Sequence, residues 1–484
     1  MHKKFVLNII SRIVLTVCFF MLLPLGWAVY DDIHSQESKA FMFTIFLGMI
    51  VSNTLLTIFK IKKDETKKVN AKDGLAIVGL SWIILSAIGA LPLYLSGVAH
   101  NFTDAYFEIV SGFTTTGATI FNDIEILPRG ILFWRSLTHW LGGMGIIVLF
   151  IALLPALGTN ASKLYKAEAP GITVERIEPR IKETAKDLWT VYFILSFLQT
   201  IFLMGGGMSF FDALCHTFGT VATGGFSTKN ASIAAYDSYI QWIIIVFMLL
   251  AGSNFILHYL AIIGKPKAYF RDEEFRAYFI IVIVLIILFA GTLEINHLSF
   301  HPIRDAAFQI ISLITTTGYV TADYEVWPNT LKFVLVMLMF IGGCGGSTGG
   351  GMKFIRFFLT IKIALRSIVQ AVYPNAVIPI KFNAKPLPEK LIFSVLAFFM
   401  IFLHLIFLGG ILFSITENCD LITAFTASVS AISNIGPGLG EIGATKNFAW
   451  ISIPGKWLLI FLMLAGRLEL YSILILFVPA TWKK

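Results

Sequence analysis

Charged side chains are scarce in this sequence. Lys, Arg, Asp and Glu together make up 14% of the 484 residues, whereas hydrophobic residues make up 57%. Because a soluble globular domain is about 25% charged, this composition argues against a soluble protein and indicates a chain that crosses a membrane many times. The formal net charge of +8 does not indicate nucleic-acid binding, since the Lys and Arg residues lie in loops between apolar segments.

Cysteines and clustered polar side chains are also rare. The cysteines are scattered without a Cys-x-x-Cys pair, which argues against a disulfide framework and a metal site: Cys18, Cys215, Cys344 and Cys419. A polytopic membrane enzyme would need clustered His, Asp, Glu or Ser residues within the apolar segments. Beyond Arg467 and Glu469 we find no such cluster. We therefore expect neither an enzymatic activity nor a bound cofactor.

The chain does contain an internal repeat, which is a strong guide to architecture. A glycine-containing stretch occurs four times, each time after a short apolar run and before a long apolar segment. In three copies an Asp-Ala pair lies about a dozen residues before the glycine, and in the fourth Thr423 replaces the aspartate. We expect these aspartates to be helix N-caps: Asp104, Asp212 and Asp305. The four stretches are Thr115-Thr116-Gly117, Ala222-Thr223-Gly224, Thr316-Thr317-Gly318 and Asn434-Ile435-Gly436.

Each copy has the form of a span, a short helix and a second span. A helix of ten residues covers only ~15 Å, about half of the hydrocarbon core, so the short helices should dip into the membrane and return. The second spans are expected at residues 131–157, 239–263, 331–372 (interrupted) and 456–477. The sequence thus predicts an all-α polytopic membrane protein, with four span–pore-helix–span repeats around a central pore and an extra N-terminal pair of transmembrane helices. The expected units are residues 1–70, 71–160, 183–264, 272–373 and 386–484.

The basic residues predict the orientation of the chain, because Lys and Arg are enriched in cytoplasmic loops. Both termini and the connections between the units are basic, including Lys3, Lys4, Lys62, Lys63, Lys67, Lys68, Lys163, Lys166, Arg176, Arg180, Lys483 and Lys484. The opposite loops are poorer in Lys and Arg and include Asp123, Glu125, Asp323 and Glu325. We therefore expect ten full crossings, an uncleaved first helix and two cytoplasmic termini.

The repeated stretch has the chemistry of a cation filter. Glycine adopts backbone angles that other residues avoid, so it can turn successive carbonyls toward one axis. Four such segments would form rings of carbonyl oxygens that replace the hydration shell of a cation, as in potassium channels. The threonine hydroxyls would add further oxygens. One Thr-Thr-Gly is usually a turn, but four copies in the same setting indicate a filter.

On these residues the chain resembles the Trk/Ktr/HKT superfamily of potassium transporters. The extra N-terminal pair makes it similar to the Trk branch, the TrkH-like transmembrane subunits, rather than to the Ktr branch. The resemblance covers essentially the whole chain and implies potassium uptake across the bacterial inner membrane, with K⁺ as the transported ion. Sodium- or proton-coupled symport, as in Ktr-like members, is the alternative. The twelve residues of the four stretches would line the ion path, with segment four departing most because Asn434-Ile435 replaces Thr-Thr.

The resemblance also implies partners. We expect a homodimer surrounded by membrane lipid, with a pore inside each subunit. A cytoplasmic TrkA-like regulatory subunit would bind NAD(H) or ATP/ADP. The basic cytoplasmic loops are compatible with that partner and do not establish it.

A run of glycines, Gly342 to Gly351, interrupts the second span of the third repeat. Each glycine costs a helix ~1 kcal/mol, so the helix should break there. The run lacks the Gly-Lys-Ser/Thr ending of a phosphate-binding loop. The resemblance implies a gating loop below the filter, made of Gly345, Gly346, Ser347, Thr348, Gly349 and Gly350.

Arg467 falls in the middle of the last expected span. A charge within the membrane costs at least ~2.5–3.5 kcal/mol unless it faces water or a partner. Two interpretations remain open: a pore-facing cation just below the filter, which the resemblance favours, or a structural ion pair with another span.

Overall fold

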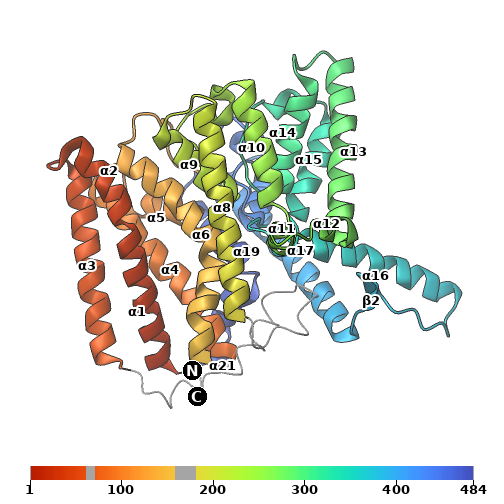
Figure 1. Ribbon diagram of the computed structural model, residues 1–484, viewed down its shortest axis with the longest axis horizontal. Coiled ribbons are helices and arrows are strands. Elements are labelled where there is room, and N and C mark those ends of the chain that lie inside the picture. Colours follow the sequence, from red (N-terminus) through yellow and green to blue (C-terminus); the bar gives the residue numbers. More distant parts are fainter. Residues whose placement is uncertain (1, 61–70, 158–180, 483–484) are drawn as a thin grey trace.

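Long helices run side by side through most of the molecule, and shorter helices lie between them (Figure 1). The structure is a computed structural model that describes residues 2–60, 71–157 and 181–482. The basic connections expected at residues 61–70 and 158–180 lie outside the described residues. The N- and C-terminal ends of the chain lie at the same end of the molecule in Figure 1.

The first two expected spans form a pair beside the rest of the molecule (Figure 1). Helix α1 (Lys3–Phe20) continues into α2 (Leu22–Asp32), and α3 (Gln36–Ile58) returns antiparallel to them. Ser35 caps α3 by accepting a hydrogen bond from Ser38 N. Glu37 Oε1 accepts from Ile131 N at 2.7 Å. A buried side chain of this pair therefore caps the start of the second span of the first repeat, the helix that begins at Arg129.

Four further units follow, each in the order long helix, short helix, second span. They comprise α4 (Ala71–Leu95), α5 (Phe102–Phe113) and α6 (Arg129–Leu157); α8 (Ile181–Gly205), α9 (Phe210–Val221), α10 (Ser238–Ala251) and α11 (Phe255–Ile262); α13 (Glu273–Ile295), α14 (Pro302–Ile314), α15 (Asn329–Ile341) and α16 (Phe354–Val372); and α17 (Glu389–Glu417), α18 (Leu421–Ser433), α19 (Ile453–Arg467) and α20 (Tyr471–Leu474). The connecting elements are η4 (Ser232–Ala235), α12 (Ala268–Arg271), η5 (Tyr324–Val326), an antiparallel pair β1 (Lys381–Phe382) and β2 (Lys385–Pro386), η6 (Gly440–Ile442), η7 (Ile475–Phe477) and α21 (Pro479–Trp482).

Among the described residues, six helices are long and apolar enough to cross a membrane, or up to eight if each of two bent pairs counts as one span. The expected ten crossings also include α6 and the 13-residue α15. The short helices α5, α9, α14 and α18 are buried along nearly their whole length. They therefore lie inside the bundle of long helices.

The prediction of continuous second spans in units two and four was wrong. Helices α10 and α11 meet at 100°, and α19 meets the α20–η7 segment at 119°. At the first break, Gly252 O accepts from Cys344 N at 2.8 Å and Phe255 N donates to Gly346 O at 3.1 Å. The loop from Gly342 to Gly351, called the glycine loop below, thus replaces hydrogen bonds that the break removes. Irregular backbone at membrane depth requires such partners. Apolar composition alone gave no sign of either bend.

The prediction that aspartates cap the short helices was wrong by one turn. Asn101 caps α5 and Ser209 caps α9, while Asp104 and Asp212 lie inside the first turn and accept from the caps at 2.9 and 2.8 Å. In the fourth unit Asp420 is the N-cap itself. Hydrogen bonds from Thr423 and from backbone N–H groups hold the pKa of Asp420 below its usual value. An acidic side chain in a first turn also faces the positive end of the helix dipole.

Candidate ion filter and gate

All four short helices end in the same backbone conformation. One of the two residues that follow each helix has left-handed backbone angles. The N–H of the next residue donates to a carbonyl five residues earlier, as in a Schellman motif. The left-handed residues are Thr115 (φ 54°), Thr223 (φ 56°), Thr316 (φ 62°) and Asn434 (φ 55°). The return bonds are Thr116 N to Ser111 O (2.8 Å), Gly224 N to Gly219 O (2.7 Å), Thr317 N to Ser312 O (2.8 Å) and Ile435 N to Ser430 O (3.1 Å).

A left-handed threonine is an outlier, because its branched Cβ crowds the backbone. Three occur here at equivalent positions, and outliers of this kind persist where the surrounding structure enforces them, often at functional sites. Two residues further on, each segment has a glycine that also has positive φ: Gly117 (82°), Gly225 (81°), Gly318 (75°) and Gly436 (98°). The four segments therefore share one conformation over three residues.

These segments close a ring. Each positive-φ glycine packs so tightly against a carbonyl oxygen of the next segment that no side chain would fit between them. A methyl carbon on the glycine would lie at these distances from that oxygen: Gly117 to Gly224 O 2.2 Å, Gly225 to Thr317 O 2.1 Å, Gly318 to Ile435 O 1.8 Å, and Gly436 to Thr116 O 2.7 Å. The contacts run from segment one to two, three, four and back to one. Segments one and three are therefore opposite each other.

The register of segment two differs from the expected one. The stretch equivalent to Thr115-Thr116-Gly117 is Thr223-Gly224-Gly225 rather than Ala222-Thr223-Gly224. The same number of residues separates Asp104 from Gly117, Asp212 from Gly225 and Asp305 from Gly318. That spacing could have identified the register from the sequence alone.

Side chains on the short helices hold the backbone beyond the ring, and sequence reasoning missed them. They lie at one equivalent position before the glycine. Glu108 accepts from Ile120 N at 2.9 Å, and the His216 ring bonds Ser227 Oγ at 2.9 Å. Gln309, with its amide oriented by its hydrogen bonds, accepts from Thr321 N at 2.9 Å. The fourth unit has Ala427 there, and Thr426 next to it accepts from Leu439 N at 3.0 Å.

We call these side chains, at positions 108, 216 and 309, the brace residues. One of them, Glu108, belongs to a buried ion pair. Arg135 Nε donates to Glu108 Oε1 at 2.7 Å, with both side chains almost fully buried. The Arg135 guanidinium also lies 4.2 Å from the centre of the Phe226 ring, just after segment two. Removing one partner of a buried ion pair strongly destabilises the folded protein, because the remaining charge is left unpaired. Glu108 and Arg135 therefore link the residues that directly follow segment one to those that directly follow segment two.

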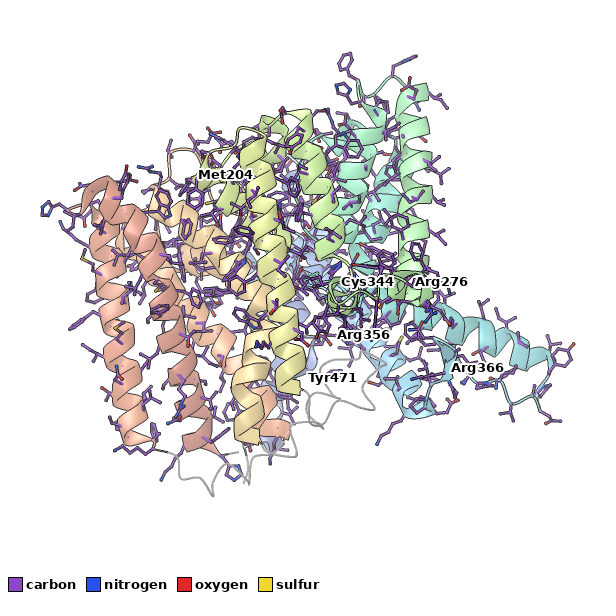
Figure 2. All side chains as sticks on the ribbon, viewed as in Figure 1. Met204, Arg276, Cys344, Arg356, Arg366 and Tyr471 are labelled. Atoms are coloured by element: carbon purple, nitrogen blue, oxygen red, sulfur yellow. The ribbon has the colours of Figure 1, made fainter. Side chains whose placement is uncertain are left out.

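The glycine loop lies directly against the inner side of the ring. Gly350 N donates to Thr316 Oγ1 at 2.6 Å, and Thr348 Oγ1 donates to Val221 O at 2.9 Å. A methyl carbon on Gly350 would lie 2.4 Å from Ser433 O. The loop thus contacts the inner ends of three short helices. Figure 2 shows Cys344, which belongs to this loop, near the middle of the molecule.

Arg467 contacts this loop, although not from the middle of a span. It is the last residue of α19, at the break, and only 3% exposed. Its Nη1 donates to Thr348 O at 2.7 Å and its Nη2 to Gly142 O at 3.0 Å. Glu469 instead pairs with Arg356 at 2.5 Å. Arg467 therefore joins the loop to α6 through carbonyl oxygens.

Two further ionisable side chains hold the loop. Glu274 Oε1 accepts from Gly345 N at 2.6 Å. Lys353 donates to Ser347 O at 3.2 Å and also to Gly349 O. Among the residues that the structure describes, no group of three or more His, Cys, Asp or Glu side chains gathers to hold a metal ion. The oxygens of this site are thus mainly carbonyls and hydroxyls, which suit a hard monovalent cation.

Comparison with known proteins agrees with this geometry. A family model for TrkH, described as a cation transport protein, matches residues 37–484. The chain belongs to the TrkH family. This membership and the fold confirm the predicted superfamily and its all-α polytopic membrane architecture, and they set aside the interpretation as a membrane enzyme.

Members of the TrkH family align over the whole chain. The "Trk system potassium uptake protein TrkH" of Salmonella typhimurium is 39% identical over 492 residues and covers 100% of both chains. The TrkH of Vibrio parahaemolyticus is 41% identical over 426 residues, which is 86% of this chain and 87% of that protein. The crystal structure titled potassium transporter TrkH from Vibrio parahaemolyticus superimposes with a TM-score of 0.89 at 35% identity, covering 100% of both chains.

Proposed function

We propose that this protein takes up K⁺ through the ring formed by its four filter segments. The observation that carries the proposal is the close contact of each positive-φ glycine with a carbonyl of the next segment, since these four contacts close a ring. Carbonyl oxygens arranged around one axis can replace the water around K⁺. The potassium uptake named for the TrkH relatives supports the same conclusion.

We propose these filter residues: Thr115, Thr116, Gly117, Thr223, Gly224, Gly225, Thr316, Thr317, Gly318, Asn434, Ile435 and Gly436. Ala222 lies just before the left-handed residue of segment two and would flank the path rather than line the ring. Hydroxyls differ around the ring, because the middle position is a threonine in the opposite segments one and three (Thr116 and Thr317) but is Gly224 in segment two and Ile435 in segment four. We expect this asymmetry to make discrimination between K⁺ and Na⁺ weaker than in a four-fold channel.

We propose that the glycine loop is the gate and that Arg467 holds it closed. The contact between Gly350 and Thr316, with Arg467 bound to Thr348 O, supports a loop that blocks the inner mouth of the ring. The proposed gate comprises Gly345, Gly346, Ser347, Thr348, Gly349, Gly350 and Arg467. A cytoplasmic TrkA-like subunit that binds NAD(H) or ATP/ADP would open it by moving α16, which begins where the loop ends.

The purified protein in liposomes tests transport directly. Uptake of ⁸⁶Rb⁺ should occur down its own gradient, should be inhibited by external K⁺ more than by Na⁺, and should not need a proton or sodium gradient. Uptake that ceases when both of these gradients are removed would instead support the coupled-symport alternative. No uptake under any gradient, by correctly folded protein with either the wild-type gate or the Arg467→Ala substitution, would contradict the proposal.

We further propose a homodimer in the bacterial inner membrane with both termini in the cytoplasm. The two ends of the chain lie at one end of the molecule, which supports that orientation (Figure 1). Reporter fusions at Met1 and Lys484 should both be cytoplasmic, and a fusion near Asp323 should be external. One external terminus would remove a crossing from the proposed topology.

A further inference from the structure

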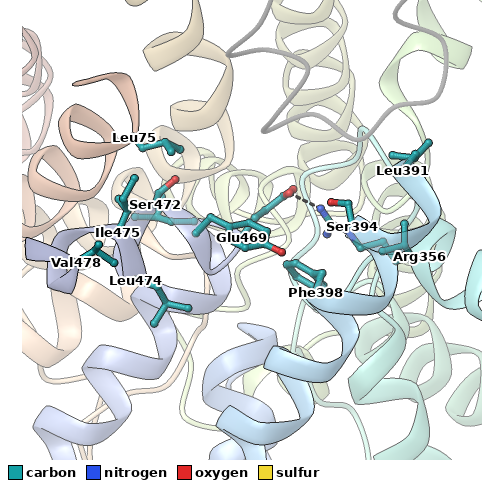
Figure 3. Close-up of a pocket in the computed structure, with 13 residues that line it drawn as sticks. Leu75, Arg356, Leu391, Ser394, Phe398, Glu469, Ser472, Leu474, Ile475 and Val478 are labelled. Atoms are coloured by element: carbon teal, nitrogen blue, oxygen red, sulfur yellow. Dashed lines mark hydrogen bonds and ion pairs between the residues drawn. The ribbon is translucent and has the colours of Figure 1, made fainter. Parts of the chain in front are cut away.

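A cavity of about 500 Å³ lies beside the break between α19 and α20, and none of its lining residues belongs to the proposed filter or gate. Its walls come from the start of α4, the start of α17 and the segment after the break, and they are mostly apolar (Figure 3). Apolar lining residues include Leu75, Leu391, Leu474, Ile475 and Val478. Pockets of this size and character commonly hold small apolar or amphipathic ligands.

One ion pair lies between these apolar walls. Arg356 Nη2 and Glu469 Oε2 are 2.5 Å apart, and their side chains are 7% and 23% exposed. The Arg356 guanidinium also lies 4.0 Å from the centre of the Phe398 ring and donates to Met352 O at 3.2 Å. Figure 3 shows the carboxylate of Glu469 pointing to Arg356 across the cavity. An arginine has five N–H donors, and its planar group matches a phosphate well.

The depth of the cavity indicates what reaches it. Leu391 lies in the first turn of α17 and Leu75 just after the first turn of α4, so the cavity lies near the ends of these long helices. Exposed Lys390 is adjacent to Leu391 on the same helix. Acyl chains and anionic headgroups meet at this depth of a bilayer, and basic side chains near a membrane surface attract anionic lipid.

We propose that this cavity binds one acyl chain of an anionic phospholipid, whose phosphate contacts Arg356 in place of the Glu469 carboxylate. The apolar walls accommodate the chain, and Arg356 provides the charge-assisted hydrogen bonds. Ser394, which also lines the cavity, offers a further donor to the phosphate. The proposal rests on the cavity and its ion pair, and not on ion transport.

Such a ligand would also act on the glycine loop. Arg356 lies in the first turn of α16, immediately after the loop, and Glu469 lies two residues after Arg467. Glu469 and Leu470 both have positive φ, 53° and 64°, so the break that joins these two charges is strained. A ligand that separates Arg356 from Glu469 would therefore favour any conformation in which α16 moves away from α19.

Binding can be measured on the full-length protein without any flux assay. Purified protein in detergent is titrated with phosphatidylglycerol or phosphatidylcholine and examined by native mass spectrometry. We expect one phosphatidylglycerol per chain, held about tenfold more tightly than phosphatidylcholine, because the choline cation offsets the charge of the same phosphate beside Arg356 and Lys390. Millimolar inorganic phosphate alone should not displace it. Equal retention of the two lipids, or displacement by phosphate, would overturn the proposal.

Two variants test the position of the site. Leu391→Trp fills the cavity and should abolish the tightly held lipid, whereas Leu408→Trp on the exposed face of the same helix should not. Glu469→Gln removes the carboxylate that competes for Arg356 and should tighten phosphatidylglycerol binding severalfold. Lipid binding that is unchanged in Leu391→Trp, or weakened in Glu469→Gln, would place the lipid elsewhere.

Discussion

The filter ring and the glycine loop beneath it are both irregular backbone inside the bundle, but they are held in different ways. In the ring, backbone contacts backbone: return bonds close each helix end, and each glycine touches a carbonyl of its neighbour. The loop has backbone bonds to the α10–α11 break, but it is also held by ionisable side chains from three places, namely Glu274 on α13, Arg467 on α19 and Lys353 at its own end. Unlike the ring, the loop can therefore be loosened by changing side-chain contacts alone.

This difference suits a fixed filter above a movable gate. A change in one ring segment is transmitted to the next segment, because the four glycine contacts form a closed cycle. Loop positions that differ by a few contacts can differ by only a few kcal/mol, as in other switching elements. We therefore expect ring substitutions to alter which ion passes, and loop substitutions to alter how often it passes.

The largest effect should come from Gly318→Ser. A side chain would meet Ile435 O at 1.8 Å, and left-handed backbone costs a non-glycine residue ~1–2 kcal/mol. We expect the preference for K⁺ over Na⁺, measured by competition with ⁸⁶Rb⁺ uptake in liposomes, to fall at least about tenfold. Gly97→Ser is the control, since Gly97 has φ 78° and no atom near its missing side chain. Wild-type selectivity in Gly318→Ser would disprove the filter assignment.

The second prediction concerns the register of segment two. Gly225→Ala should impair selectivity nearly as much as Gly318→Ser, because a methyl group there meets Thr317 O at 2.1 Å. Gly224→Ala should have a smaller effect. Its methyl group would meet the His139 ring at 2.5 Å, and a side chain can move more easily than backbone. The same competition assay compares them, and the reverse order of effects would favour the register in which Gly224 aligns with Gly117.

The sequence predicted the repeated architecture because its signals are local. Apolar run length marked the long helices, and glycine content marked the interruption between α15 and α16. The repetition also predicted the ring, although segment two was assigned a register one residue too early. What it could not predict depends on contacts between distant segments. The bend after Ala251 is stabilised by Cys344 and Gly346, and Arg467 finds its acceptors on Thr348 and Gly142. No spacing rule pairs such positions.

The brace residues show the same limit. Glu108, His216 and Gln309 share one position, but their side chains are chemically different, so no motif links them in the sequence. Only the common direction of their hydrogen bonds, toward the residues just after the ring, reveals a shared role. The pairing of Glu108 with Arg135 likewise depends on how α5 packs against α6.

The third prediction concerns the gate. Arg467→Ala removes two hydrogen bonds from a charged donor, each contributing ~1.5–3 kcal/mol. We expect basal ⁸⁶Rb⁺ uptake without a partner subunit to rise roughly tenfold, with K⁺ preference unchanged. Deleting part of the loop should act in the same direction. Arg467→Lys, which keeps the charge but loses the fork of donors, should lie between Arg467→Ala and wild type. Uptake equal to wild type in a folded Arg467→Ala variant would favour a purely structural role.

The smallest effect should come from Glu274→Gln. Glu274 is 4% exposed and accepts from Gly345 N at 2.6 Å, so it holds the loop at a different residue from Arg467, which contacts Thr348 O. Glutamine keeps one acceptor oxygen but replaces the other carboxyl oxygen with an NH2 group, and a change of this kind alters such a hydrogen bond by ~1 kcal/mol. We expect basal ⁸⁶Rb⁺ uptake to rise about threefold, with the ion preference of the ring unaltered. Glu273→Gln is the matched control, because its partner Lys362, 2.7 Å away, lies outside the loop. If Glu274→Gln changed ion preference instead of uptake rate, the loop and the ring would be one mechanical unit, and the division between fixed filter and movable gate would be wrong.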